Sequence, residues 1–173
     1  MKYLGYYDSP LGLVTLAGDA DSLTGLWFKG QSHYMSGLEN KETAERETDA
    51  FRQTKKWLDI YFSGRDPGFI PPIKVEATPF RTVVADILLT IPFGSTASYL
   101  DIAREAARRT GHERMSARAA GNAVGHNPIS LIIPCHRVIG AGGSLTGYAG
   151  GLEKKIWLLR TEGHTIEGMK LIR

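Results

Sequence analysis

The chain has 173 residues, a net charge of +3 and an apolar fraction of 42%, which is ordinary for one globular domain or two small ones. No stretch reaches the ~20 apolar residues of a membrane-spanning helix, and the start of the chain lacks the apolar core of a signal peptide, so we expect a cytoplasmic protein with no membrane partner. The single cysteine excludes an internal disulfide and a multi-cysteine zinc site.

The first part of the chain has the pattern of a small α/β domain. Turn-forming sequences separate short runs that alternate in polarity, which predicts β-strands at residues 2–7, 12–17 and 22–28. A helix is predicted over residues 43–63, because Phe51 and Leu58 recur near helical spacing and Gly64 ends the pattern. Three prolines then stiffen the connector, so we expect one domain with its linker at residues 1–77 and a second at residues 78–173.

The second part is expected to be mostly helical. Thr78 suits the N-cap of a first helix. Ser98 and Asp101 form a capping box for a second helix that runs to about Arg109, and Ser116 caps a third. A helix, a turn and a second helix rich in small residues are typical of DNA-reading domains, although an ordinary helical hairpin has the same pattern.

Three further segments complete the predicted order. The apolar run Ile129–Ile133 is expected to be a buried strand or extended segment. Residues 140–151 are expected to form a glycine-rich loop, and residues 152–162 a last helix that Gly163 ends.

The sole cysteine follows the apolar run in the sequence PCHRV, with His136 next to Cys135. A thiol beside an imidazole at the end of a buried segment favours nucleophilic chemistry, whereas the alternative is an inert buried thiol. Neighbouring side chains in a strand point to opposite faces. The chain therefore turns at Cys135, or a water joins the two groups.

Small residues surround a lone arginine at the start of the third predicted helix. Arg118 lies among Ser116, Ala117, Ala119, Ala120 and Gly121. Small side chains let a helix enter the narrow minor groove of DNA, but they also let two helices pack closely. Basic residues outnumber acidic ones after Thr78 and not before it, which favours a polyanionic partner for the second half.

The sequences MSARAAGNAVGHNP, PCHRV and LTGYAGGLEKKIWLL resemble the active-site half of the O6-alkylguanine-DNA alkyltransferase family. The resemblance runs from about Thr78 to Gly163, and the N-terminal third matches only through its SPLG turn. It implies an α/β, ribonuclease-H-like N-terminal domain and a mostly α-helical C-terminal domain with a helix-turn-helix. It also implies a monomer without metal or cofactor.

The activity that this resemblance implies is DNA repair by single-turnover alkyl transfer. An alkyl group, chiefly methyl, would pass from O6-alkylguanine in double-stranded DNA irreversibly to Cys135, with O4-alkylthymine left open as a second substrate. His136 would take the thiol proton through a water, and Glu162 would hold the far side of the imidazole. Asn127 would brace the active-site turn, and Tyr99 would donate a hydrogen bond to guanine N3.

The resemblance also assigns DNA-binding and pocket residues. Arg118 would replace the flipped base in the stack, within a minor-groove helix that includes Ser116, Ala117, Ala119 and Gly121. The alkyl pocket would be lined by Tyr148, Ala149, Gly150 and Val138. Arg137 is expected to anchor a contact between the domains.

One segment departs from the family pattern, because Tyr99 to Arg118 is longer than in the shortest members. The stretch between the two helices carries a basic cluster, and we expect some of its members to contact DNA phosphates: Arg104, Arg108, Arg109 and Arg114. A solvated helix end is the alternative.

Two other functions are weighed against alkyl transfer. A non-catalytic DNA-binding relative that senses alkyl lesions would lack the cysteine at position 135. A cysteine hydrolase would need an oxyanion hole and turnover, and the Cys-His order and the Arg118 helix argue against it.

Overall fold

The computed structural model describes residues 1–172, which fold into two compact units. The first comprises Met1–Glu76 together with Pro128–Ser130, and the second comprises Ala77–Asn127 and the chain from Leu131 onward. Within the described residues, no helix is long and apolar enough to cross a membrane.

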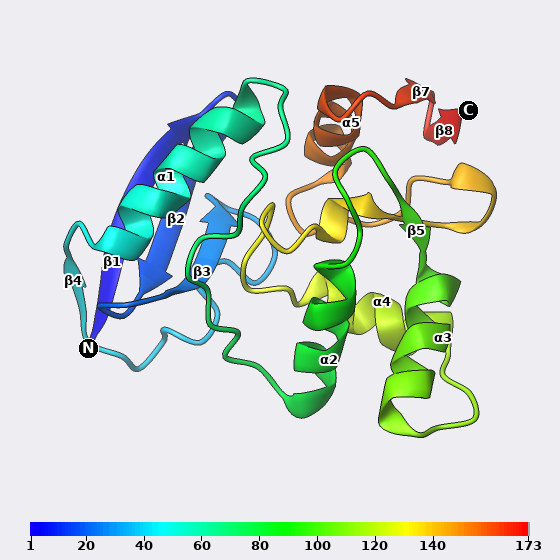
Figure 1. The fold of residues 1–173 in the computed structure, drawn as a ribbon, viewed down its shortest axis with the longest axis horizontal. Helices are drawn as coiled ribbons and strands as arrows, with labels where there is room; N and C mark the ends of the chain where they lie inside the picture. Colours follow the sequence, from blue (N-terminus) through cyan, green and yellow to red (C-terminus); the bar gives the residue numbers. More distant parts are fainter. Residues whose placement is uncertain (173) are drawn as a thin grey trace. The chain divides into compact units, whose positions relative to one another are not determined.

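The first unit is a four-stranded sheet in the order β3-β2-β1-β4, with one helix packed on it (Figure 1). Its elements are β1 (Lys2–Ser9), β2 (Gly12–Gly18), β3 (Leu23–Phe28), β4 (Thr43–Glu45) and α1 (Asp49–Phe62). The first three strands are antiparallel and β4 pairs parallel to β1. Phe51 of α1 lies so close to the sheet that a Cβ at Gly5 would be 2.8 Å from its ring. The glycine therefore permits close helix–sheet packing.

The helix predicted from residue 43 begins later in the structure. Residues 43–45 form the edge strand β4, and Thr48 caps α1 by accepting a hydrogen bond from the Phe51 backbone N–H at 3.1 Å. Sequence periodicity missed this boundary, because a three-residue edge strand is too short to show a period of its own.

The apolar run at Ile129–Ile133 is buried as predicted: its first residue is extended and bridges Leu26, whereas residues 130–132 form a turn and not a strand. Pro128–Ser130 extends along β3: the Leu26 N–H donates to Pro128 O at 2.9 Å, and the Ser130 N–H donates to Leu26 O at 3.0 Å. Leu131 then has φ 70°, which is rare for a bulky residue and takes the chain out of any strand.

Three helices build one side of the second unit (Figure 1). They are α2 (Pro79–Leu88), α3 (Tyr99–Thr110) and α4 (Ala117–Gly125), and they pack against one another. Thr78, Ser98 and Ser116 cap them through their hydroxyls. Gly111 ends α3 with φ 73°, a left-handed conformation that favours glycine.

The rest of this unit holds the predicted last helix together with short elements that the sequence did not predict. Two two-residue strands, β5 (Ala97–Ser98) and β6 (Val138–Ile139), pair in parallel. A 3₁₀ turn, η1 (Cys135–Arg137), precedes β6, and a second, η2 (Ala141–Gly143), follows it. The last helix α5 (Leu152–Thr161) is followed by the hairpin β7 (Thr165–Glu167) and β8 (Lys170–Ile172). Leu159 of α5 packs with Ile139, Leu145 and Ile166 in a buried cluster.

Candidate active site

Cys135 begins the 3₁₀ turn η1, and only 4% of its surface is exposed. The turn is closed by backbone hydrogen bonds from Cys135 N–H to Ile133 O at 2.8 Å and from Arg137 N–H to Pro134 O at 3.0 Å. The chain therefore turns at the cysteine, which was one of the two alternatives that the sequence left open.

The surroundings of the thiol act on its ionisation in opposite directions. Burial raises the pKa of Cys135, while a hydrogen bond from the Asn127 side chain and the positive charge of Lys155 favour the thiolate. Burial dominates, so the thiol is the resting form and a proton acceptor is needed to generate the nucleophile.

Glu162, at the end of α5, is the carboxylate that organises this site. Its Oε1 lies 2.6 Å from His136 Nε2, and Arg137 Nε donates to its Oε2 at 2.9 Å. The Gly94 N–H also donates to Oε2, at 3.1 Å. Burial opposes ionisation of Glu162, but the bonds from His136 and Arg137 outweigh it and lower its pKa to about 2. The carboxylate is therefore ionised near neutral pH.

His136 is completely buried against this carboxylate. Burial lowers its pKa below the ordinary value, and the charge of Glu162 only partly offsets this effect. The imidazole is thus neutral near pH 7. Since ionised Glu162 accepts a hydrogen bond from Nε2, the tautomer with the proton on Nε2 is favoured, which makes Nδ1 the basic nitrogen.

Asn127 links the end of α4 to the segment before the cysteine. Its Nδ2 donates to Ile133 O at 2.8 Å, and the residue is only 8% exposed. This bond, together with the contact to the thiol noted above, fixes the backbone two residues before Cys135. The arrangement agrees with a bracing role.

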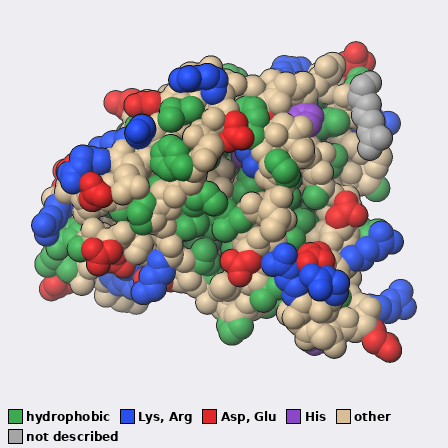
Figure 2. Space-filling view, viewed as in Figure 1, with side chains coloured by type: hydrophobic (Ala, Val, Ile, Leu, Met, Phe, Trp, Pro, Cys, Tyr) green, Lys and Arg blue, Asp and Glu red, His purple; other side chains and the backbone are tan. Residues whose placement is uncertain are grey.

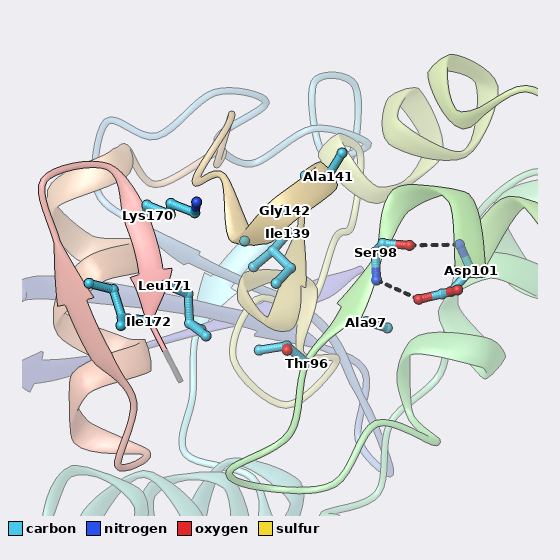
Figure 3. A pocket seen from close by; sticks show the side chains of 12 residues that line it. Thr96, Ala97, Ser98, Asp101, Ile139, Ala141, Gly142, Lys170, Leu171 and Ile172 are labelled. Carbon is cyan, nitrogen blue, oxygen red and sulfur yellow. Dashed lines mark hydrogen bonds between the residues drawn. The ribbon is translucent and has the colours of Figure 1, made fainter.

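Tyr99 reaches the site because β5 pairs with β6. Ala97 lies opposite Val138 and Ser98 opposite Ile139, so the first residue of α3 lies beside the strand that follows the cysteine turn. The Ser98–Asp101 capping box fixes this helix start through bonds of 3.0 and 2.9 Å, drawn as dashed lines in Figure 3. Burial raises the pKa of Tyr99, so its hydroxyl keeps its proton at neutral pH.

The loop before α5 carries the predicted pocket residues Tyr148, Ala149 and Gly150, each half-buried. The Tyr148 hydroxyl is buried and has no hydrogen-bond partner among residues 1–172. Burial raises its pKa well above the ordinary value, so it remains a neutral donor. Val138, the fourth predicted pocket residue, is fully buried in β6.

The predicted DNA-binding residues lie on α4 and its N-cap. Ser116, Ala117, Arg118 and Ala119 are all exposed at the start of this helix, whereas Ala120 is buried. Gly121 faces α3: a Cβ there would lie 3.4 Å from the Tyr99 ring. Some small residues of α4 therefore pack against α3, and others are exposed around the side chain of Arg118.

A cavity of about 730 Å³ opens next to these elements without including Cys135 among its lining residues. β5, the η2 turn and β8 surround it, and Figure 3 shows Leu171 and Ile139 pointing toward its interior. None of the predicted site residues lines this cavity.

Comparisons with known proteins show the family of the chain. The family model described as "6-O-methylguanine DNA methyltransferase, DNA binding domain" matches residues 79–164, and the model of its ribonuclease-like domain matches residues 2–75. The chain belongs to this family.

Individual relatives cover nearly the whole chain. A methylated-DNA–protein-cysteine methyltransferase of Methanosarcina acetivorans is 39% identical over 162 residues, which are 93% of this chain and 98% of the relative. The protein of that name from Mycobacterium tuberculosis is 41% identical over 155 residues, 90% of this chain and 88% of the relative. The crystal structure of M. tuberculosis OGT in complex with DNA matches with a TM-score of 0.79 at 39% identity, covering 92% of each chain.

The sequence did not predict the contacts of two residues near the site, Arg137 and Lys155. Arg137 was expected to anchor a contact between domains, but it binds Glu162 and donates to Ile91 O at 2.7 Å, both within the second unit. Lys155 is fully buried, although it is a lysine. The sequence contains a signal for this burial. Lys155 is three residues from both Leu152 and Leu158, a spacing that places it on the apolar face of the helix.

Proposed function

We propose that this protein repairs DNA by transferring a methyl or larger alkyl group from guanine O6 to its own Cys135. The observation that carries the proposal is the buried Cys135 turn with His136 held by an ionised Glu162, in a chain whose family is named for methyl transfer to cysteine. A non-catalytic relative would not keep the thiol. A hydrolase would need a route for water to a nearly inaccessible sulfur.

The chemistry is a single displacement. His136 takes the thiol proton through a water, the Sγ–carbon bond forms, and the carbon–O6 bond breaks with its electrons passing to guanine. The proton that neutralises the departing base comes from a donor at the ring, for which Tyr99 is the candidate. The alkyl carbon of the thioether is not activated and the scheme contains no group that removes it, so each molecule acts once.

Mass spectrometry after mixing with an O6-methylguanine duplex tests this function directly. We expect a stable gain of one methyl group, mapped to Cys135. No gain would favour a lesion-binding protein, and a transient acyl adduct would favour a hydrolase. An O4-methylthymine duplex in the same assay decides whether that lesion is a second substrate.

The lesion lies inside the duplex, so transfer requires the base to be flipped out, which costs a few kcal/mol. We assign α3 and α4 to a helix-turn-helix whose second helix enters the minor groove. The exposed residues Ser116, Ala117 and Ala119 allow a close approach, and Arg118 fills the space that the flipped base leaves. The pocket loop then receives the base beside Tyr148, Ala149 and Gly150.

Replacing Arg118 with alanine is expected to slow repair of duplex DNA far more than reaction with free O6-benzylguanine. A flipped nucleotide leaves a gap in the stack, and the free base does not. Single-turnover rates on both substrates provide the measurement, with Lys170→Ala, an exposed lysine of β8, as the control. Equal losses on the two substrates would make Arg118 a structural residue.

The arginines of the basic cluster fall into two groups, those that form ion pairs with Glu105 and those that do not. Glu105 pairs with Arg108 at 2.7 Å and with Arg109 at 2.8 Å, and these contacts lower its pKa to about 2. Arg104 and Arg114 make no ion pair among residues 1–172 and line a cavity of about 550 Å³ at the end of α3. Lys and Arg side chains gather at this edge of the molecule in Figure 2. We assign Arg104 and Arg114 to DNA phosphates.

Replacing Arg104 and Arg114 together with alanine should weaken binding to damaged and undamaged duplex alike. Each lost phosphate contact lowers the magnitude of the log–log salt slope by ~0.9, so the pair lowers it by up to ~1.8. Titrations at several salt concentrations measure this slope, and Arg52→Ala on α1 is the matched control. If the slope does not change, the cluster is a solvated helix end.

A further inference from the structure

Lys155 is a buried lysine whose ammonium group is surrounded by backbone carbonyls. It is 0% exposed, and its Nζ donates to Val138 O at 2.6 Å, Thr146 O at 3.0 Å and Gly147 O at 3.2 Å. A lysine has three N–H donors, so this set uses all of them. The side chain therefore ties the pocket loop to β6, the strand that follows the cysteine turn.

The Tyr99 hydroxyl is directed at two of the same carbonyls. Its distances are 3.4 Å to Thr146 O and 3.5 Å to Gly147 O, far beyond the 2.7–2.8 Å typical of O–H donors. The Lys155 bonds to these oxygens are shorter and carry a full charge, so they are the stronger pair. Lys155 also lies against Tyr99, with Nζ 5.8 Å from the centre of its ring.

We propose that Lys155 is a positioning residue that holds the carbonyls of Thr146 and Gly147, so that the Tyr99 hydroxyl can leave them for the substrate base. This inference rests on the proposed alkyl transfer. Thr146 and Gly147 lie on an exposed part of the loop, so the short, charged bonds from buried Lys155 are what hold their carbonyls, and the adjacent residues 148–150 are those assigned to the alkyl pocket. With Lys155 in place, the loop keeps its donors when Tyr99 moves.

Without Lys155, the Tyr99 hydroxyl is the other side-chain donor that residues 1–172 direct at both carbonyls, which holds it on the loop and away from guanine. Lys155 and Tyr99 are then coupled in the reaction, although Lys155 itself does not touch the reacting atoms. If Lys155 were merely structural, its loss would lower stability, but Tyr99→Phe would slow the reaction by the same factor with or without Lys155.

A double-mutant cycle in single-turnover kinetics tests this coupling. At saturating O6-methylguanine duplex, Tyr99→Phe should slow transfer by about 100-fold in the wild-type background, as for the loss of one donor in a transition state. In a Lys155→Met background it should slow transfer by less than about 10-fold, because the hydroxyl is already diverted. Lys155→Met alone should slow transfer by at least about 10-fold, with DNA affinity, measured in a Cys135→Ala background, changed by less than about threefold.

Lys170→Met, an exposed lysine of the same unit, is the matched control and should leave the rates unchanged. If the double variant loses rate by the product of the two single fold-losses, the two residues are independent and the proposal is overturned. A transfer rate of Lys155→Met equal to that of the wild type would also overturn it. A wild-type protein that gains no methyl group would instead contradict the alkyl transfer itself.

A crystal structure of Cys135→Ala bound to the same duplex tests the proposal without altering Lys155, in case the methionine variant does not fold. We expect Lys155 Nζ within hydrogen-bond distance of Thr146 O and Gly147 O, and the Tyr99 hydroxyl on the base. A lysine that has left these carbonyls, or a tyrosine that remains on them, would exclude the proposed role.

Discussion

Replacing Cys135 with alanine is expected to abolish alkyl transfer while the protein still binds O6-methylguanine DNA. Cys135 is the only thiol of the chain, and the substitution removes one buried sulfur atom without adding volume. Intact-protein mass spectrometry measures transfer, and fluorescence anisotropy with a labelled duplex measures binding. We expect no detectable methyl gain and an affinity within about threefold of the wild type, because the loss is confined to the nucleophile.

An undamaged duplex of the same sequence is the control for specific binding. The assignment of the nucleophile would be wrong if the alanine variant gained a methyl group on another side chain. A large loss of affinity would show instead that the sulfur supports the fold of the DNA-binding unit.

Glu162→Gln is expected to have the second largest effect, on both stability and rate. The carboxylate is 6% exposed and holds both His136 and Arg137, so its loss leaves a buried guanidinium without its counter-charge. Removing one partner of a buried pair costs ~3–5 kcal/mol in the free energy of unfolding. Transfer should slow by ~100-fold or more, because the imidazole loses the group that orients it as a base.

The same substitution should change how stability depends on pH. The pKa of Glu162 is about 2 in the fold and 4.5 in its ordinary state, so its ionised form stabilises the protein above about pH 4.5. That stabilisation, ~3 kcal/mol, is lost as the pH falls from about 4.5 toward 2. Urea denaturation from pH 7 to pH 3 should therefore show a shallower decline for Glu162→Gln than for the wild type.

Glu153→Gln, an exposed glutamate on α5, is the matched control and should retain the wild-type pH dependence. Parallel curves for the wild type and Glu162→Gln would mean that Glu162 titrates normally and is not the organising charge of the site.

The sequence predicted the family and the two kinds of domain, and the comparisons confirm them, because PCHRV and its flanking motifs are local and specific. Local signals also predicted the helix caps at Thr78, Ser98 and Ser116. The roles given to Arg118 and to the pocket residues stay predictions.

Long-range contacts were the part that the sequence did not predict. Arg137 and Lys155 find their partners through the position of α5, which no local pattern encodes. The pairing of β5 with β6 involves two residues per strand, less than the length over which alternation is visible. The run Ile129–Ile133 was misinterpreted because continuous burial looks alike in a strand and in a turn, and only the backbone of Leu131 distinguishes them.

The burial of Cys135 has a consequence for how long the protein stays usable. A molecule that reacts once must keep its sulfur unspent until a lesion arrives. Oxidants attack thiolates that they reach, and here Cys135 is only 4% exposed and burial raises the pKa of its thiol. Peroxide and soluble disulfides therefore meet a protonated, covered group. We therefore expect the enclosure that confines the alkyl acceptor to slow its oxidation before a lesion arrives.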